Sequence, residues 1–381
     1  MTGNRKKITV KNGISFNGKT YSYVLRVPDP DTGATKPRWV SGFTTEKQAK
    51  LERDKARIAL ATNTYVTVSG ITVGQFVDNW IELHANQLKP TSLSKYRSYL
   101  RLYLKPGLGS IKLQELKPSH VQTLYAQLLE RPLSPSTVHY VGSILKQALN
   151  YAVDVEGLLA TNPVKKVSTP KGQSVTPDLW NKDELNQFLK ASSNHRLSFF
   201  FRLSAFTGAR RGELCALRWS DFDGLSLTIS KSRVKADRQV LELNSTKGGT
   251  NGRRTIKVDA DTMELLKAHR KRQIQERMAI GECWTDTGYV FVRENGLPID
   301  VQTPTHLFRK LSKQAGLKLI RLHDLRHLHA TELLRLGVPL HVVAHRLGHR
   351  DAMVTATIYA HVTDEQIETA SETFAHAMSG N

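Results

Sequence analysis

The chain has 381 residues, which is too long for one ordinary domain and favours two or three. Hydrophobic residues make up 39% of it and charged residues 23%, so the chain can bury a core, and wholesale disorder is excluded. Its 55 Lys and Arg against 34 Asp and Glu give a formal net charge of +21, and the excess is spread along the whole chain. Such a charge indicates a protein that lies along a polyanion, with a basic protein that binds no nucleic acid as the alternative.

Membrane and secreted classes are excluded next. No run of about 18 apolar residues occurs, and the densest stretch, Phe199–Phe206, is interrupted by Arg202 and Ser204. The N-terminus is polar and basic, which predicts no secretory signal. The only cysteines, Cys215 and Cys283, exclude a disulfide framework and a multi-cysteine zinc module. We therefore expect a cytoplasmic protein with no membrane partner.

Residues 1–65 predict a small three-stranded sheet followed by a helix. The Asn17-Gly18 pair is typical of a tight hairpin turn, and a second turn at Asp29–Gly33 leads into a third strand. Thr45 and Gln48 form a capping-box pattern for a helix that runs to Leu60. The expected strands are Ile14–Phe16, Tyr21–Val27 and Arg38–Phe43.

Basic side chains occur along these strands and turns. A basic sheet face of this kind can enter a DNA groove, and a merely solvated sheet face is the alternative. The candidate DNA contacts are Lys19, Arg26, Lys36 and Arg38.

Residues 71–168 predict an all-α bundle of four or five helices. Apolar residues recur there at helical spacing, beginning with Val73, Phe76 and Val77. Pro106-Gly107 is expected to separate two helices. Linkers are predicted at Thr62–Gly70 and Thr169–Pro177, and the later helices at Leu93–Leu104, Pro118–Leu129 and Ser136–Val153.

Residues 176–381 predict a mostly α domain with a small antiparallel β patch, so the fold class is α+β and multidomain. Lys247–Gly252 is expected to be a glycine-rich hairpin tip between the last two strands, and Gly337 and Gly348 lie where helices should end. The expected strands are Leu225–Ile229, Val240–Leu243 and Thr255–Val258. The expected helices are Asp183–Ala191, Arg196–Phe206, Arg210–Arg218, Asp261–Ala279, Thr303–Ala315, Leu325–Leu336 and Leu340–Leu347.

The second half of the chain holds Arg, Lys, His and Tyr residues suited to phosphoryl transfer without a metal. The sequence has neither a GxxxxGK[ST] phosphate loop nor a GxGxxG turn. The stretch from Thr207 to Glu213 places Arg210 in the first turn of a helix, where its guanidinium can bind two phosphate oxygens. Glu213 is expected to hold either Arg210 or the helix start, and an arginine capping network is the alternative.

Two further sites carry histidines. Asp324 is predicted to be the N-cap of a helix, which puts Arg326 in its first turn and His323 just outside it. His349 follows Leu347-Gly348 at the end of the next helix. An imidazole can pass or hold a proton near neutral pH, although either histidine taken alone is more often a packing residue.

A zinc site is the competing explanation for the histidines. No HExxH motif occurs, and arginines interleave the whole run, which disfavours a cation site. We therefore predict no metal and no cofactor. The histidines concerned are His323, His327, His329, His341, His345 and His349.

Tyr359 lies ten residues beyond His349. A free tyrosine with a pKa near 10 is only about one part in a thousand phenolate at pH 7, so it becomes a nucleophile only beside cations or a base. The order of Arg210 in TGxRxxE, His323 and Arg326 in HxxR, His349 in LGH and then Tyr359 resembles the tyrosine recombinase (phage integrase) family. The resemblance covers roughly residues 178–381.

The resemblance implies a role for each residue. Arg210 and Arg326 would hold the scissile phosphate while Tyr359 attacks it, leaving a 3′-phosphotyrosyl link and a free 5′-hydroxyl. His323 would act as general base or proton shuttle, and His349 would donate a hydrogen bond to the phosphate. Lys247 would protonate the leaving oxygen, and Lys235 and Lys257 are the nearby alternatives for that lysine.

The resemblance also implies partners and a division of labour. Residues 1–65 resemble an arm-site DNA-binding domain, residues 71–168 a core-binding domain, and residues 176–381 the catalytic domain. The implied function is integration or excision of a phage or mobile element by a homotetramer on double-stranded DNA, in the cytoplasm of a bacterial host at the nucleoid. A directionality factor and a host DNA-bending protein are implied accessories. A chromosome-dimer resolvase, a transposon recombinase and a non-catalytic DNA-binding repressor are the alternatives.

Overall fold

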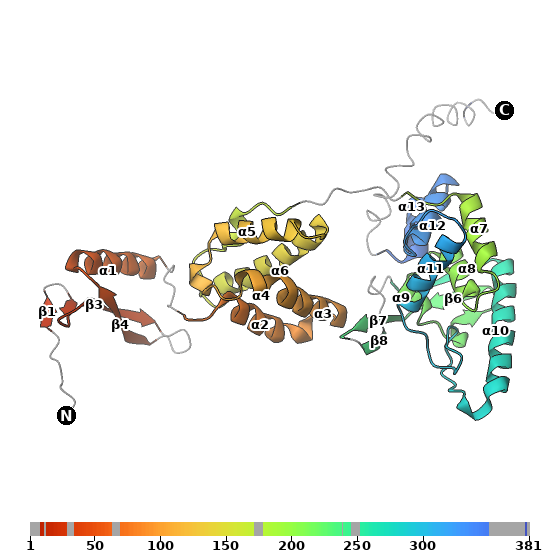
Figure 1. The fold of residues 1–381 in the computed structure, drawn as a ribbon, viewed down its shortest axis with the longest axis horizontal. Helices are drawn as coiled ribbons and strands as arrows, with labels where there is room; N and C mark the ends of the chain where they lie inside the picture. Colours follow the sequence, from red (N-terminus) through yellow and green to blue (C-terminus); the bar gives the residue numbers. More distant parts are fainter. Residues whose placement is uncertain are drawn as a thin grey trace. The chain divides into compact units, whose positions relative to one another are not determined.

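The computed structural model describes residues 8–10, 13–28, 34–62, 69–170, 178–237, 239–244, 252–349 and 378 (Figure 1). Over these residues the fold is helix-rich with small antiparallel sheets, which confirms the predicted fold class. Its contacts divide the chain into two compact units, Met1–Gln173 and Ser174–Asn381, with the boundary inside the predicted linker Thr169–Pro177. Among the described helices, none is long and apolar enough to span a bilayer.

The N-terminal sheet has four strands rather than the predicted three. The additional strand pairs Val10 with Ile14 and Ile8 with Phe16. It was missed because a three-residue alternation of apolar and polar side chains is too short to separate a strand from a loop. The strands are β1 (Ile8–Val10), β2 (Ile14–Phe16), β3 (Tyr21–Pro28) and β4 (Thr35–Phe43), in the antiparallel order β1-β2-β3-β4.

The turn and the helix of this region follow from local hydrogen bonds. The Asn17 side-chain oxygen accepts from the backbone N–H groups of Lys19 and Thr20, which closes the predicted hairpin. Helix α1 (Glu46–Ala61) is capped by Thr45, whose hydroxyl accepts from the Gln48 N–H. The Gln48 side chain accepts from the Thr44 hydroxyl, so only half of the expected capping box forms. The core under α1 consists of Ile14, Tyr23, Leu25 and Ala49.

The helical block begins with a complete capping box. Thr72 accepts from the Gln75 N–H, and the Gln75 side chain accepts from the Thr72 N–H. The apolar faces of its helices share one core, in which Phe76, Leu124 and Leu145 are buried. The helices are α2 (Val73–Leu83), α3 (Pro90–Tyr99), α4 (Lys105–Leu108), α5 (Pro118–Leu129) and α6 (Pro135–Asp154).

Pro106 does not separate two helices as predicted. Residues Leu100–Leu104 form a π-helical turn that joins α3 to α4 without a break. The Lys105 N–H bonds the Leu100 carbonyl, five residues back. A proline lacks an N–H and its ring collides with the carbonyl of the preceding turn in an α-helix, and a wider π turn relieves both problems.

The second unit packs helices around a small β patch. Its core is rich in aromatic side chains, including Phe188, Phe201 and Phe308. The helices are α7 (Lys182–Ser192), α8 (Ser198–Thr207), α9 (Arg211–Leu214), α10 (Ala260–Ile280), α11 (Thr303–Gln314), α12 (Asp324–Arg335) and α13 (Leu340–Leu347). The strands are β5 (Phe222–Asp223), β6 (Ser226–Ile229), β7 (Ser232–Ala236), β8 (Gln239–Leu243) and β9 (Arg254–Lys257).

The strand pairing corrects one prediction. Strand β8 pairs with β7, and β9 pairs with β6 in another sheet, so the two strands that flank residues 245–251 do not form a hairpin with each other. The error arose because β7 was missed, since its five residues, Ser-Arg-Val-Lys-Ala, include only two apolar side chains. The described residues leave out 245–251, the predicted turn Asp29–Gly33 and most of both predicted linkers.

Candidate active site

The loop that carries Arg210 begins at a glycine for two reasons. Gly208 ends α8 in the left-handed conformation, with φ 62°, which disfavours any side chain. A Cβ at this position would also lie 2.5 Å from Leu347 and 2.9 Å from His329. The glycine therefore lets α8 turn sharply while α12 and α13 pack closely against it.

Glu213 holds Arg210 by two atoms. Its Oε2 accepts from the Arg210 backbone N–H at 2.9 Å, and its Oε1 accepts from the Arg210 guanidinium at 2.9 Å. Both roles predicted for Glu213 are thus present. The expected helix Arg210–Arg218 is only the one turn α9, because the chain turns into a strand-like segment at Arg218. The helix dipole is correspondingly small, and the guanidinium supplies most of the positive potential.

Arg326 is almost fully buried, with 4% of its surface exposed. Its two terminal nitrogens donate to the Gly208 carbonyl at 2.7 Å and to the Leu347 carbonyl at 2.8 Å, which ties the start of α12 to the ends of α8 and α13. Burial and the neighbouring Arg210 lower the pKa of Arg326 to about 9, so it stays charged at neutral pH.

The predicted N-cap role of Asp324 is wrong. Residue His323 occupies the N-cap position, and Asp324 is the first residue of α12. The Asp324 carboxylate points back and accepts from the Arg321 backbone N–H at 2.8 Å and from the Arg321 guanidinium. The tight turn from Arg321 to Asp324 makes this arrangement possible, because the Asp324 N–H bonds the Arg321 carbonyl.

Arg254 belongs to the same cluster and was missed by the sequence analysis. Its guanidinium donates to Glu213 Oε2 at 2.8 Å, and both side chains are almost completely buried. The signal was present, since Arg254 alternates in phase with buried Ile256 along β9. A charged residue on the inner face of a strand indicates a buried ion pair.

Three guanidiniums converge on the last carbonyls of α13. Arg254 Nε donates to the Arg346 carbonyl at 2.8 Å, Arg326 to that of Leu347 at 2.8 Å, and Arg210 to that of Gly348 at 3.4 Å. The last carbonyls of a helix have no partner within the helix and carry the negative end of its dipole. The cations therefore stabilise this helix end, and His349 follows it directly.

The two candidate imidazoles lie in the positive potential of these arginines. Burial, with the charges of Arg326 and Arg210, lowers the pKa of His349 to about 4. Partial burial, His327 and the same two arginines lower the pKa of His323. The rings of His323 and His327 meet edge to face at 5.1 Å. His349 is therefore neutral at pH 7, and the same influences favour a neutral His323, able to accept or donate a proton.

Acidification is expected to destabilise the second unit through two buried histidines. Burial lowers the pKa of His269 and of His329 to about 4. Each neutral ring accepts a hydrogen bond from an arginine, Arg272 or Arg346, and a protonated ring could not accept that bond. Because the folded-state pKa values lie below the unfolded-state value, the unfolded chain binds more protons between about pH 6.5 and pH 4. The free energy of unfolding should fall by about 2 kcal/mol or more from pH 7.5 to pH 5.

Urea unfolding at a series of pH values measures this effect. The variant His269→Gln should show a clearly smaller pH dependence, whereas His341→Gln, a change at an exposed histidine, should behave as the parent. If His269→Gln showed the same pH dependence as the parent, protonation of His269 would not be a cause of the loss of stability.

The structure bears on the zinc alternative in two ways. Among the described residues no group of three His, Cys, Asp or Glu side chains has a geometry that could hold a metal ion. His329 accepts a hydrogen bond from Arg346 at 3.1 Å, which occupies its Nε2.

Two of the six expected site residues, Lys247 and Tyr359, lie outside the described residues. The alternatives to Lys247 have partners elsewhere. Lys235 Nζ donates to Asp300 at 2.8 Å, and Lys257 Nζ donates to the Ser226 hydroxyl at 2.8 Å. The other four expected residues form one cluster, joined by contacts or charge interactions. They are Arg210, Arg326, His323 and His349.

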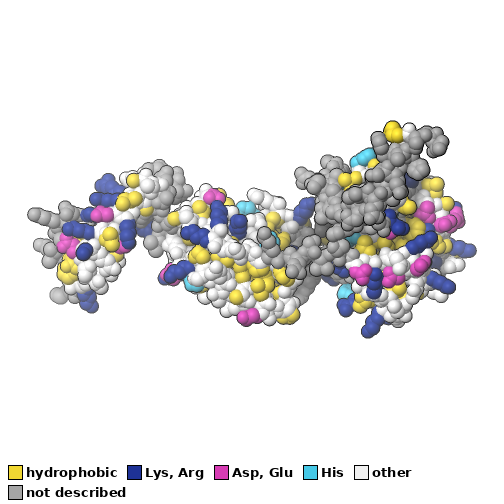
Figure 2. Space-filling model, turned by 90° about the horizontal axis from the view of Figure 1, so that it is seen from above, with side chains coloured by type: hydrophobic (Ala, Val, Ile, Leu, Met, Phe, Trp, Pro, Cys, Tyr) yellow, Lys and Arg dark blue, Asp and Glu magenta, His cyan; other side chains and the backbone are white. Residues whose placement is uncertain are grey.

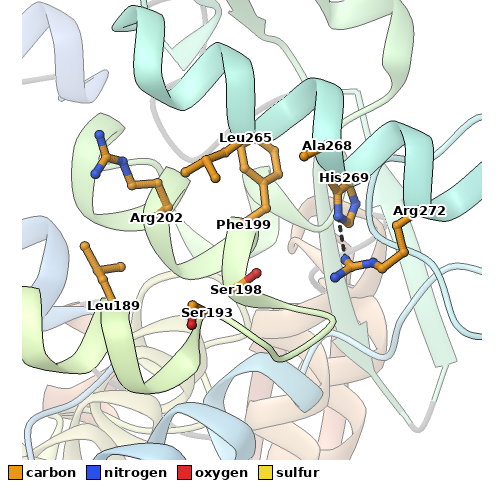
Figure 3. A pocket seen from close by; sticks show the side chains of 9 residues that line it. All are labelled: Leu189, Ser193, Ser198, Phe199, Arg202, Leu265, Ala268, His269 and Arg272. Carbon is orange, nitrogen blue, oxygen red and sulfur yellow. Dashed lines mark hydrogen bonds between the residues drawn. The ribbon is translucent and has the colours of Figure 1, made fainter.

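Two cavities among the described residues are lined by none of the residues of this cluster. One of about 270 Å³ is lined by α7, α8 and α10, and Figure 3 shows Phe199 beside Leu265 within it and the hydrogen bond between His269 and Arg272. Arg202 pairs with Asp259 there. The second, of about 230 Å³, lies beside Trp219 and Tyr289. The arginines of the first cavity are bonded to protein groups, so it presents no evident anion site.

The four basic residues of the N-terminal sheet do not share one face. Strand pairing places Arg38 opposite buried Leu25 and Lys36 opposite Val27, on the side of the sheet that α1 covers. Arg26 is exposed on the other side, and Lys19 lies in the hairpin turn. The prediction of a single basic face is therefore wrong, because the alternation of β3 and β4 was not matched in register. Figure 2 shows basic side chains on each part of the chain.

The fold is that of DNA integrases. The chain matches the Tn1549 transposon integrase in complex with transposon right end DNA, with a TM-score of 0.68 and 20% identity, over 80% of this chain and 100% of that one. It also matches a lambda integrase tetramer bound to a Holliday junction, with a TM-score of 0.60 and 19% identity, over 92% and 94% of the two chains.

Sequence similarity defines the family. Residues 179–366 match the description "Phage integrase family", and residues 72–129 match "Phage integrase, N-terminal SAM-like domain". The chain is 30% identical to a XerC-like tyrosine recombinase of Caldanaerobacter subterraneus subsp. tengcongensis, over 95% of this chain and 98% of the relative. It is 26% identical to the ICEBs1 integrase of Bacillus subtilis, over 72% and 74% of the two chains. The chain belongs to the phage integrase family of tyrosine recombinases, which are DNA-breaking and DNA-rejoining enzymes.

Proposed function

We propose that this recombinase integrates or excises a phage or other mobile element by cleaving its attachment site through Tyr359. The observation that carries the proposal is the convergence of Arg210, Arg326 and His349 at the end of α13. Such a cluster of donors stabilises a phosphorane-like transition state by charge, with no metal and no cofactor.

The proposed chemistry assigns one step to each group. The Tyr359 oxygen forms a bond to the scissile phosphorus while the bond to the 5′-oxygen breaks. A neutral His323 takes the phenol proton, and Lys247 gives a proton to the leaving oxygen. The 5′-hydroxyl of another strand then reverses the reaction, and the phosphotyrosyl ester conserves the energy of the broken bond, so no nucleotide is needed.

The neutral state of the histidines supports this division. A proton acceptor must be unprotonated at working pH, and burial, His327 and the neighbouring arginines favour that state for His323. Burial and the arginine charges also keep His349 neutral. Arg326 in turn stays cationic at neutral pH, which keeps its anion-binding charge separate from the proton-transfer groups.

The test is capture of the covalent complex. The parent chain is incubated with a nicked duplex that carries an element–host junction from the DNA flanking the gene, so that the released oligonucleotide diffuses away. We expect a protein–DNA adduct that forms in excess EDTA, with the DNA mapped by mass spectrometry to the peptide containing Tyr359. Attachment to another tyrosine, or loss of the adduct in EDTA, would contradict the proposal.

We propose three domains for this task. Residues 71–168 and 176–381 bind the core site, and residues 1–65 bind arm sites through the exposed Arg26 and Lys19, whereas Lys36 and Arg38 lie on the side of the sheet that α1 covers. Arg26 is the best placed of the four for an approach from the open side of the sheet. The functional assembly is a homotetramer on double-stranded DNA, aided by a directionality factor and a host DNA-bending protein, in the cytoplasm of a bacterial host at the nucleoid.

Deletion of residues 1–65 should separate these roles. The truncated chain is expected to cleave a core duplex at a rate within about threefold of the parent and to lose about tenfold or more in affinity for a long attachment site, because its arm contacts are gone. Gel-shift titration on short and long duplexes measures both. An equal loss on the two duplexes would argue against an arm domain.

A transposon recombinase is the second candidate. The solved structure of an integrase from the Tn1549 transposon shares this fold, which favours that possibility. Sequencing the flanking DNA distinguishes the two, because a transposon and a prophage differ in the genes that accompany the recombinase.

A further inference from the structure

Arg254 contacts three segments that surround the candidate site, although it is not one of the expected site residues. Its terminal nitrogens donate to Glu213 Oε2 at 2.8 Å and to the Gly252 carbonyl at 3.1 Å, and its Nε donates to the Arg346 carbonyl at 2.8 Å. Its side chain has 0% of its surface exposed. It therefore has no route to DNA and acts only through its neighbours.

The contact with Glu213 sets the charge available at Arg210. One buried carboxylate faces two guanidiniums, so the three groups carry a net charge of +1. Without Arg254, Glu213 would be neutralised by Arg210 alone, and Arg210 would have less charge left for a phosphate. The positive charge of Arg254 also contributes to the low pKa of Glu213.

The contact with α13 sets the position of His349. Gly348 packs directly on the Arg254 guanidinium, since a Cβ at Gly348 would lie 2.7 Å from Arg254 Nη1. Gly348 has φ 66°, which turns the chain into His349. The bond from Arg254 to the Arg346 carbonyl holds the last turn of the helix beneath this glycine.

The third contact lies at the end of the segment that contains Lys247. Gly252 is the first described residue after that segment, and its carbonyl accepts from Arg254. One side chain thus joins the Arg210 loop, the His349 turn and the start of β9.

We propose that Arg254 is a positioning residue that aligns Arg210 and His349 for cleavage, an inference that rests on the proposed roles of those two residues. It explains why a strand in a small β patch carries a fully buried arginine. Misplacement of reacting groups by about 1 Å can cost about 100-fold in rate, which is the size of effect expected from its loss.

The experiment compares Arg254→Met and Arg254→Lys with matched changes at Arg233, a second buried arginine, which donates to the Ile299 carbonyl at 2.9 Å. Single-turnover adduct formation is measured on the nicked duplex, and DNA affinity is measured by gel shift. We expect Arg254→Met to lose about 100-fold in rate and Arg254→Lys about tenfold, with affinity within about threefold. The Arg233 variants should lose less than about threefold per folded molecule.

A purely structural role would not move the titration profile of the His349 imidazole. Because the charge of Arg254 helps to lower the pKa of His349, its removal should shift this profile, followed by NMR, to higher pH in Arg254→Met. The Arg233 variants should keep the parental profile. Since Arg254 acts partly through Glu213, the double variant Glu213→Gln with Arg254→Met should be no slower than the slower single variant.

A folded Arg254→Met protein with the parental rate and profile would overturn the proposal, as would a loss that matches the unfolded fraction. If Arg254→Met does not fold, the rates and titration profiles of Arg254→Lys and of the double variant test the proposal in its place. An adduct formed by the parent chain and lost in Tyr359→Phe tests the proposed function separately, so failure of one does not imply failure of the other.

Discussion

Replacement of Tyr359 by phenylalanine is expected to abolish the covalent protein–DNA adduct, with a loss of at least about 10³-fold in cleavage. The change removes one oxygen atom, the proposed nucleophile, and leaves in place the arginines that we propose bind the phosphate. DNA affinity should therefore stay within about twofold of the parent. Gel electrophoresis of the nicked duplex under denaturing conditions measures the adduct, and gel-shift titration measures binding.

The matched control is Tyr289→Phe, which removes another phenol oxygen from the same unit. Tyr289 bonds Glu242 and Arg218, away from the proposed site, so its variant should retain adduct formation within a few-fold. An undiminished adduct in Tyr359→Phe would exclude Tyr359 as the nucleophile. A chain that binds DNA and never forms an adduct would instead favour the non-catalytic repressor.

Replacement of Arg326 by lysine should have the second largest effect. A single ammonium cannot reach both the Gly208 and the Leu347 carbonyls in the fork geometry that Arg326 uses, so a buried carbonyl loses its partner. We expect the free energy of unfolding to fall by about 1–3 kcal/mol. Cleavage should fall by about 10²- to 10³-fold, because a lysine starts with a pKa about two units lower and gives one donor in place of a fork.

Arg335→Lys on the same helix provides the control. Arg335 is exposed and pairs only with Glu332 among the contacts described, so its replacement should change the free energy of unfolding by less than about 0.5 kcal/mol. Urea unfolding and single-turnover cleavage measure the two effects. Parental cleavage by a folded Arg326→Lys protein would contradict the proposed role of Arg326 at the phosphate.

Local sequence patterns predicted most helices to within a few residues because apolar spacing and end residues are properties of short segments. Gly348 illustrates this, since its place after an apolar stripe indicated the end of α13. Features that depend on longer-range contacts or on unusual helix geometry were not predicted. The pairing of β8 with β7, and the π turn that carries the helix past Pro106, depend on contacts or geometries that no short pattern specifies.

The candidate site shows the same division. The order of Arg210, His323, Arg326 and His349 could be read from the chain because each stands beside a distinctive turn or helix end. Arg254 could not be assigned in this way, because its partners are Glu213, forty-one positions earlier, and Arg346, ninety-two positions later. To recognise a buried ion pair, one must know which side chains of a strand point into the core and which residues of other segments they meet there.

The anchored end of α13 also bears on the local stability of that helix. The last turn of a helix ordinarily opens at a small free-energy cost, because its carbonyls have no partners within the helix. Here three arginines bind the carbonyls of Arg346, Leu347 and Gly348, so opening this end would break three charge-assisted hydrogen bonds together. Local opening at this point should therefore cost more free energy than at an ordinary helix end, and His349 follows it directly in the chain.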